Sequence, residues 1–146
     1  MQPANPHIFY ADDDLEDLEL FRGALAEVDN SLVLTTTDNG SALLALLAAP
    51  PPVPRVIFLD LNMPELDGYE VLRTLRATDQ LRDYPVVIFS TAFDPAAVNR
   101  TLSMGANLFV PKPHTYNGMK QAIKTCVEID WTCFRPTAAD FLMRFN

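Results

Sequence analysis

Carboxylate side chains follow two apolar stretches of the chain. Asp12 and Asp13 come directly after residues 7–11, and Asp60 ends the uninterrupted apolar run 56–59. Bare carboxylates brought together repel one another, and a divalent cation removes that repulsion. Carboxylate oxygens are hard ligands, which favour magnesium. If the fold brings the two segments together, the three residues predict a magnesium site.

Asp60 is also suited to act as a nucleophile, because it stands at the tip of its apolar segment. A carboxylate can attack phosphorus and form an acyl phosphate, and a bound metal ion would bridge the incoming phosphoryl oxygens. Lys112 would supply a compact cation for the phosphoryl group, and the Ser90 hydroxyl would hydrogen-bond another of its oxygens. These residue types predict transfer of a phosphoryl group to Asp60, with Mg²⁺ as cofactor.

The same residue types also have ordinary structural interpretations. An acidic residue after a strand is often a helix N-cap, which is the preferred interpretation of Asp14. Lys112 taken alone, between two prolines, suits a solvated surface position. The pair Asp67-Gly68 indicates a turn in which the glycine supplies a positive φ. The predicted chemistry therefore depends on several residues meeting at one place, rather than on any one of them.

Strand and helix patterns alternate along most of the chain. Short apolar or β-branched runs predict strands, and apolar residues spaced three and four apart predict helices. The predicted strands cover residues 7–11, 31–37, 56–59, 86–89 and 108–110. The predicted helices cover residues 15–28, 41–49, 66–75, 95–104 and 119–127. Asp94 and Pro95 are typical of the N-cap and first turn of the fourth helix.

Five strand-helix pairs predict an α/β fold of the flavodoxin-like type, a doubly wound five-stranded parallel sheet in the order 2-1-3-4-5 with five helices. The uninterrupted third strand fits burial on both faces of such a sheet. Ligands bind beyond the carboxyl ends of the strands in this architecture. The candidate site residues follow those strand ends, so they would meet there. Pro111 lacks an N–H group and is tolerated because this order places the fifth strand at the sheet edge.

Composition and charge narrow the range of partners. The 146 residues carry a formal net charge of −8 and the isoelectric point is near 4.5, which argues against direct binding to nucleic acid. Cys126 and Cys133 are too few for a disulfide scaffold, so we expect reduced thiols. His7 and His114 are too isolated to indicate a metal site. No apolar stretch approaches the ~20 residues that span a membrane, and we expect a soluble, cytoplasmic protein.

Taken together, the motifs resemble the receiver domain family of two-component signalling. The resemblance rests on Asp12-Asp13, on residues 59–68 reading Leu-Asp-Leu-Asn-Met-Pro-Glu-Leu-Asp-Gly, on Ser90-Thr91-Ala92 and on Lys112-Pro113. It covers about residues 7–129, and we take residues 1–129 as the receiver domain. The resemblance implies that Asp60 is the phosphoacceptor, that Asp12, Asp13 and Asp60 hold Mg²⁺, and that Asn62 adds its backbone carbonyl.

The resemblance also implies how the phosphoryl group would act on the domain. Lys112 would contact it, Ser90 would be the switch hydroxyl, and Phe109 would be the aromatic residue that changes rotamer with that hydroxyl. The fourth helix, fifth strand and fifth helix would form the output face. The Lys112-Pro113 peptide bond would be cis, as X-Pro energetics permit. Pro111 departs from the family, which more often has a backbone hydrogen-bond donor at this position.

By the same resemblance, the chain would be a stand-alone response regulator in a phosphorelay. A sensor histidine kinase or phosphotransfer protein would donate the phosphoryl group, and the phosphorylated domain would contact a downstream protein. Apart from autocatalytic phosphorylation and dephosphorylation of its own Asp60, we expect no enzymatic activity. One alternative is a phosphate-independent interaction domain with the same fold. Another is an aspartyl-phosphate phosphohydrolase, which is disfavoured because Asn62 stands where that class has a second aspartate.

Residues 130–146 form a short C-terminal extension that is rich in aromatic residues. Its Trp131, Phe134, Phe141 and Phe145 make it too aromatic for a disordered tail. Two roles are predicted equally: packing back on the domain, or completing a homodimer interface, since aromatic residues are enriched in such surfaces. The fourth helix, fifth strand and fifth helix offer another surface for a homodimer.

Overall fold

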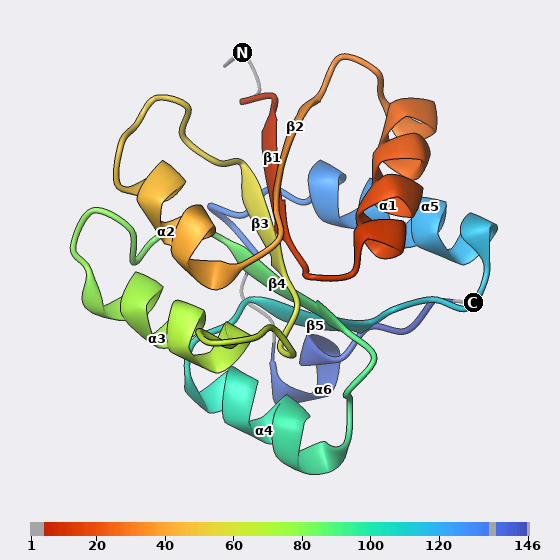
Figure 1. Ribbon diagram of the computed structural model, residues 1–146. Helices are drawn as coiled ribbons and strands as arrows, with labels where there is room; N and C mark the ends of the chain where they lie inside the picture. The colour runs from red at the N-terminus through yellow and green to blue at the C-terminus, as the bar shows by residue number, and fades with distance from the viewer. Residues whose placement is uncertain (1–4, 135–136, 146) are drawn as a thin grey trace.

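The computed structural model describes residues 5–134 and 137–145, which contain one parallel sheet of five strands (Figure 1). The strand order is β2-β1-β3-β4-β5, with β5 at one edge. The strands are β1 His7–Ala11, β2 Val33–Thr37, β3 Val56–Leu59, β4 Val86–Ser90 and β5 Leu108–Pro111. This order and the parallel pairing confirm the predicted flavodoxin-like fold. They also confirm the edge position that Pro111 requires.

Helices cover both faces of the sheet. Helices α1 and α5 pack side by side on one face, and α2, α3 and α4 lie on the other (Figure 1). The helices in the described residues are α1 Leu15–Val28, α2 Gly40–Leu47, α3 Gly68–Ala77, α4 Pro95–Ser103, α5 Tyr116–Glu128 and a short α6 Ala138–Phe141. In the part of the chain that the structure describes, no helix combines the length and apolar character needed to cross a bilayer. The five predicted helices are therefore present, with α6 as an addition.

An aromatic cluster fixes the strands that carry the acidic residues. Tyr10 of β1, Phe58 of β3 and Phe89 of β4 pack with Phe21 of α1, and their ring centroids lie 4.4–6.5 Å apart. All four side chains are fully buried, and most of the pairs have the edge-to-face geometry that aromatic quadrupoles favour. The cluster holds the ends of β1, β3 and β4 in a fixed relation beneath the sheet's carboxyl edge.

Polar side chains set where the elements begin. Asp14 caps α1 by accepting hydrogen bonds from the N–H groups of Glu16 and Asp17, which confirms the capping role predicted for it. Asp94 caps α4, with Pro95 as its first residue. The starts of the other helices shift by one to three residues from the predictions for the same reason, because Asn39 caps α2, Asp67 caps α3 and Thr115 caps α5.

The Lys112-Pro113 peptide bond does not have the cis form that the family resemblance implied. That bond is trans, whereas the cis bonds of the described chain are Pro50-Pro51 and Pro51-Pro52. The trans form is the lower-energy isomer of most X-Pro bonds, so the expectation carried by the family resemblance was wrong here. Pro111 itself pairs with Ser90 in the β4-β5 ladder, and the next N–H group, of Lys112, donates to the Ser90 carbonyl at 3.0 Å.

The C-terminal extension packs on the same domain. Trp131 and Phe134 stack edge to face with their ring centroids 5.6 Å apart, and α6 lies beside β5 and α4 (Figure 1). Phe141 is fully buried, with its ring 6.5 Å from that of Phe109. The Met143 N–H donates to the Phe109 carbonyl at 3.0 Å, which continues the sheet beyond β5. The described part of the extension thus lies against β5. Residues 135, 136 and 146 of the extension lie outside the described part.

Replacing Phe141 by Ala should lower the free energy of unfolding by about 3 kcal/mol. Burial of a large aromatic side chain is lost, but a terminal helix can detach instead of leaving a cavity, so we expect the lower part of the range for such changes. Phe93→Ala is the control, because Phe93 is 39% exposed and its contact with Arg144 contributes only about 0.5–1 kcal/mol. Urea unfolding measures both. Equal losses would contradict a docked extension.

Candidate functional site

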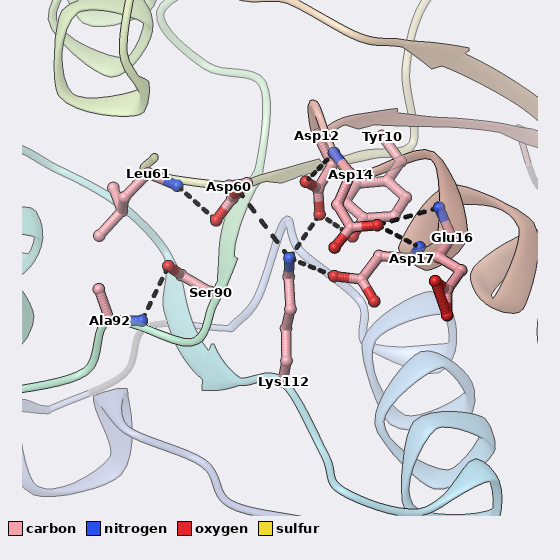
Figure 2. A network of polar contacts seen from close by, with 10 residues as sticks. All are labelled: Tyr10, Asp12, Asp14, Glu16, Asp17, Asp60, Leu61, Ser90, Ala92 and Lys112. Atoms are coloured by element: carbon pink, nitrogen blue, oxygen red, sulfur yellow. Dashed lines mark hydrogen bonds and ion pairs between the residues drawn. The ribbon is translucent and has the colours of Figure 1, made fainter. Parts of the chain in front are cut away.

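The carboxyl ends of four strands meet at one edge of the sheet (Figure 2). Backbone hydrogen bonds carry the strand pairing into the polar residues. The Asp12 N–H donates to the Thr37 carbonyl at 3.1 Å, and the Asp60 N–H donates to the Ala11 carbonyl at 3.0 Å. The site residues therefore inherit the register of the sheet, because their main chains are part of it or directly follow it.

The predicted carboxylates do come together. Asp12, Asp13 and Asp60 each offer one oxygen, and these oxygens all lie within 4.8 Å of one another. Asp12 is fully buried and Asp60 is 4% exposed, whereas Asp13 is exposed to solvent. Two distant chain segments thus form one cluster that is closed below and reached from the side of Asp13.

Lys112 is the cation of this cluster. Its Nζ lies 2.6 Å from Asp12 Oδ2, 2.7 Å from Asp17 Oδ2 and 3.9 Å from Asp60 Oδ2 (Figure 2). The lysine side chain is only 9% exposed, so a solvated surface role is excluded. Sequence reasoning missed Asp17, because an acidic residue in the first turn of a helix is ordinary and nothing in the local pattern links it to Lys112.

Tyr10 is a second residue that sequence reasoning missed. Its hydroxyl donates a hydrogen bond to Asp12 Oδ2 at 2.5 Å, and the whole residue is buried. Burial raises the pKa of Tyr10, and the neighbouring Asp12 carboxylate raises it further, so the phenol stays protonated and keeps donating. The other oxygen, Asp12 Oδ1, accepts the N–H of Asp14 at 3.0 Å. Both oxygens of Asp12 therefore have fixed partners.

The electrostatics of Asp60 reflect its crowded, buried position. Burial raises its pKa from 3.8 to about 7, and the charge of Asp12 adds to this rise. Lys112 and a hydrogen bond from Ser90 act in the opposite direction. Burial lowers the pKa of Lys112, but the hydrogen bonds to Asp12 and Asp17 outweigh it and raise that pKa above its ordinary value. Lys112 is therefore charged, and it compensates only part of the negative charge around it.

The remaining predicted residues lie on β4, on β5 and in the loop after β3. Ser90 is fully buried and its Oγ accepts the Ala92 N–H at 3.2 Å. Phe109 is also fully buried, beneath Phe141 of the extension. Asn62 is exposed in the loop after Asp60. The cluster of three aspartates is the group of candidate metal ligands within the described residues, and neither histidine belongs to it.

Gly68 has a different role from the one predicted. It does not have a positive φ; it is the first residue of α3, and Asp67 caps that helix through a capping box with Glu70. A Cβ atom on Gly68 would lie 2.3 Å from the Asp60 carbonyl oxygen and 2.7 Å from the Leu61 Cα. The turn interpretation of Asp67-Gly68 was therefore wrong, because close approach of α3 to the Asp60 main chain, and not a turn, requires the glycine.

The donor set suits a hard divalent cation. All three side chains supply carboxylate oxygens, the ligands that Mg²⁺ prefers, and an exposed third ligand leaves room for the waters that Mg²⁺ keeps. Burial and, to a smaller extent, the charge of Asp12 disfavour the ionised form of Asp60 and raise its pKa, and a bound cation would favour that ionised form. The residues present thus fit a magnesium ion.

Comparison with known proteins agrees with this geometry. Residues 8–124 match the model of the response regulator receiver domain family. The two-component response regulator ORR11 of Oryza sativa is 36% identical over 110 residues, which cover 75% of this chain and 73% of that protein. ARR17 of Arabidopsis thaliana, also a two-component response regulator, is 31% identical over 117 residues, covering 73% and 75%. The chain belongs to the response regulator receiver family.

Solved structures support the same fold. The phosphorylated cyanobacterial phytochrome response regulator RcpA superimposes with a TM-score of 0.79 at 28% identity, covering 91% of this chain and 98% of that one. Response regulator RPA3017, which acts in red light signalling of R. palustris, gives a TM-score of 0.79 at 27% identity over 90% and 99% of the two chains. The acidic cluster of Asp12, Asp13 and Asp60 fits the phosphoacceptor site of a receiver domain.

Removing the buried charge of Asp60 should stabilise the metal-free protein at high pH. The pKa of Asp60 is raised from 3.8 to about 7 by folding, so the native state is stabilised as pH falls through 7 and is penalised by the ionised carboxylate above it. Asp60→Asn should therefore unfold at higher urea concentration than wild type at pH 8 in EDTA. We expect a gain on the order of 1–2 kcal/mol after allowance for solvent screening.

The same difference should shrink as the pH is lowered from 8 to 5, because the wild-type carboxyl then takes up a proton in the native state. Asp79→Asn is the control, since that carboxylate is exposed at the opposite end of the sheet. A gain for Asp60→Asn that did not depend on pH would contradict the assigned cause.

Proposed function

We propose that this receiver domain accepts a phosphoryl group on Asp60 in a Mg²⁺-dependent reaction. Asp12, Asp13 and Asp60 would hold the ion through side-chain oxygens, and Asn62 would add its backbone carbonyl. The observation that carries the proposal is the arrangement around Asp60, which has two further carboxylates within 4.8 Å and an ammonium group 3.9 Å away. The carboxylates suit a divalent cation, and the ammonium suits a phosphoryl oxygen, so both features serve phosphoryl transfer to Asp60.

In the proposed step, a carboxylate oxygen of Asp60 forms a bond to phosphorus while the bond from phosphorus to the donor breaks, and the donor keeps the electron pair. The ammonium of Lys112 pairs with one phosphoryl oxygen, and the Ser90 hydroxyl hydrogen-bonds another. When bound, magnesium neutralises charge on the transferring phosphoryl oxygens. Lys112 Nζ lies 3.9 Å from Asp60 Oδ2, which is close enough for the ammonium to reach an oxygen of a phosphoryl group carried by Asp60. Hydrolysis of the acyl phosphate would return the carboxylate.

The proposed donor is a sensor histidine kinase or a phosphotransfer protein, and the phosphorylated domain would act through contact with another protein. Three observations support this assignment. The similar proteins in Oryza and Arabidopsis are two-component response regulators, RcpA is a phosphorylated response regulator, and the formal charge of −8 disfavours direct binding to nucleic acid. Ser90 and Phe109 would transmit the change towards α4, β5 and α5.

Incubation with acetyl phosphate and Mg²⁺ should add the mass of one phosphoryl group to the protein. Asp60→Asn should remain unmodified, because its amide cannot form an acyl phosphate. Intact-mass spectrometry reads both, and Asp79→Asn is a control that removes an exposed carboxylate far from the site. Modification of Asp60→Asn to the wild-type extent would show that the phosphoacceptor is another residue.

Asp13→Asn should abolish measurable Mg²⁺ binding, a loss of more than about tenfold, while leaving the fold intact. The matched control is Asp14→Asn, which removes a neighbouring charge but keeps a residue that caps helices equally well. Calorimetric titration gives the affinities, and circular dichroism reports folding. Equal affinities in the two variants would rule out Asp13 as a ligand.

A further inference from the structure

Lys112 has one more carboxylate partner than phosphoryl transfer requires. Besides Asp12 and Asp60, it contacts Asp17, whose Oδ2 lies 2.7 Å from Nζ. Asp17 is 95 residues away in the chain and its side chain is 23% exposed. Its backbone is fixed, because its N–H group donates to the N-cap Asp14 at 3.2 Å. The contact is therefore made by a residue held rigidly in the first turn of α1.

The metal-free cluster uses Lys112 as its counter-ion. The ammonium sits 2.6 Å from Asp12 Oδ2, an oxygen of the same carboxylate that would bind the divalent ion. A cation bound to Asp12 would repel the ammonium and compete with it for that carboxylate. Asp12 would keep a partner when the ammonium moves, because Tyr10 donates to the same Oδ2 at 2.5 Å.

We propose that Asp17 is a positioning residue that retains Lys112 beside Asp60 when a divalent cation takes over Asp12. This inference rests on the proposed function, and it adds a residue that is no part of the three-aspartate cluster. Asp17 gives the ammonium an ion-pair partner on α1 that is not itself a ligand of the metal ion. While it is paired with Asp17, Lys112 keeps an N–H group free for the phosphoryl oxygen on Asp60.

Without the Asp17 carboxylate, the carboxylate partners of Lys112 within the described residues are Asp12 and Asp60, which are also the proposed metal ligands. Cation binding must then displace the ammonium into solvent rather than towards Asp17. Removal of the Asp17 charge should therefore weaken Mg²⁺ binding, and it should do so through Lys112. A simple loss of negative charge near the site would also weaken binding, but it would not depend on the lysine.

The test is a double-mutant cycle measured by calorimetric titration with Mg²⁺ alone, in the absence of any phosphoryl donor. Asp17→Asn should bind Mg²⁺ about fivefold more weakly than wild type, the upper range for a partly exposed ion pair. Lys112→Ala should bind more tightly than wild type, because the competing ammonium is gone. Adding Asp17→Asn to Lys112→Ala should change the affinity less than about twofold.

Glu16→Gln is the matched charge control. Glu16 is the preceding residue of the same helical turn and points away from Lys112 (Figure 2), so its effect should stay below about twofold. Equal loss for Asp17→Asn with and without Lys112 would overturn the proposal, as would no loss in either background. The proposed function fails separately, if wild-type protein binds no Mg²⁺ or if Asp60 is not phosphorylated.

Discussion

Uncompensated negative charge at a buried position is the constraint on which the site depends. The ammonium of Lys112 lies 2.6–3.9 Å from the carboxylates of Asp12, Asp17 and Asp60, and Asp13 adds a fourth carboxylate close to Asp12 and Asp60. One positive charge cannot balance four negative ones, and at Asp60 burial, together with the smaller effect of the Asp12 charge, raises the pKa to about 7. A proton on Asp60 or a divalent cation can relieve the same excess. The two are therefore alternatives, and metal binding should favour the ionised, nucleophilic carboxylate.

The fold tolerates the repulsion within this cluster because the apolar part of the sheet below it is tightly packed. Tyr10 belongs to both parts, since its ring packs with Phe21, Phe58 and Phe89 while its hydroxyl binds Asp12. Gly68 allows α3 to lie close to the Asp60 main chain, because a Cβ atom at this position would clash with the Asp60 carbonyl oxygen. The positions of Asp12 and Asp60 thus follow from packing and main-chain hydrogen bonds. They do not depend on attraction between the acidic side chains, which repel one another.

Periodicity was enough to predict the strands, and the flavodoxin-like fold class supplied their order. The edge at which the site residues meet followed, because parallel strands place their carboxyl ends together. Periodicity was not enough for Asp17 and Tyr10. Asp17 looks like any acidic residue in a first helical turn, and only the three-dimensional path of Lys112 identifies it. Tyr10 looks like a core residue, because its polar atom is a single hydroxyl. The role of Gly68 was predicted wrongly because a close approach between two main-chain segments has no signature in the neighbouring sequence.

The C-terminal extension changes what the α4 and β5 side of the domain offers to another protein. Phe109 pairs with Ile88 in the sheet, and on its outer edge it is covered by Phe141 and bonded through its carbonyl to Met143. A groove is left beyond it, lined by Phe93, Asp94, Pro95, Val98, Asn99, Leu142 and Arg144. A partner docking there meets the extension together with the start of α4, and not the Phe109 ring. Phe141 packs on Phe109, and Leu142 both pairs with Phe109 and lines this groove, so the extension is part of the surface that the domain presents.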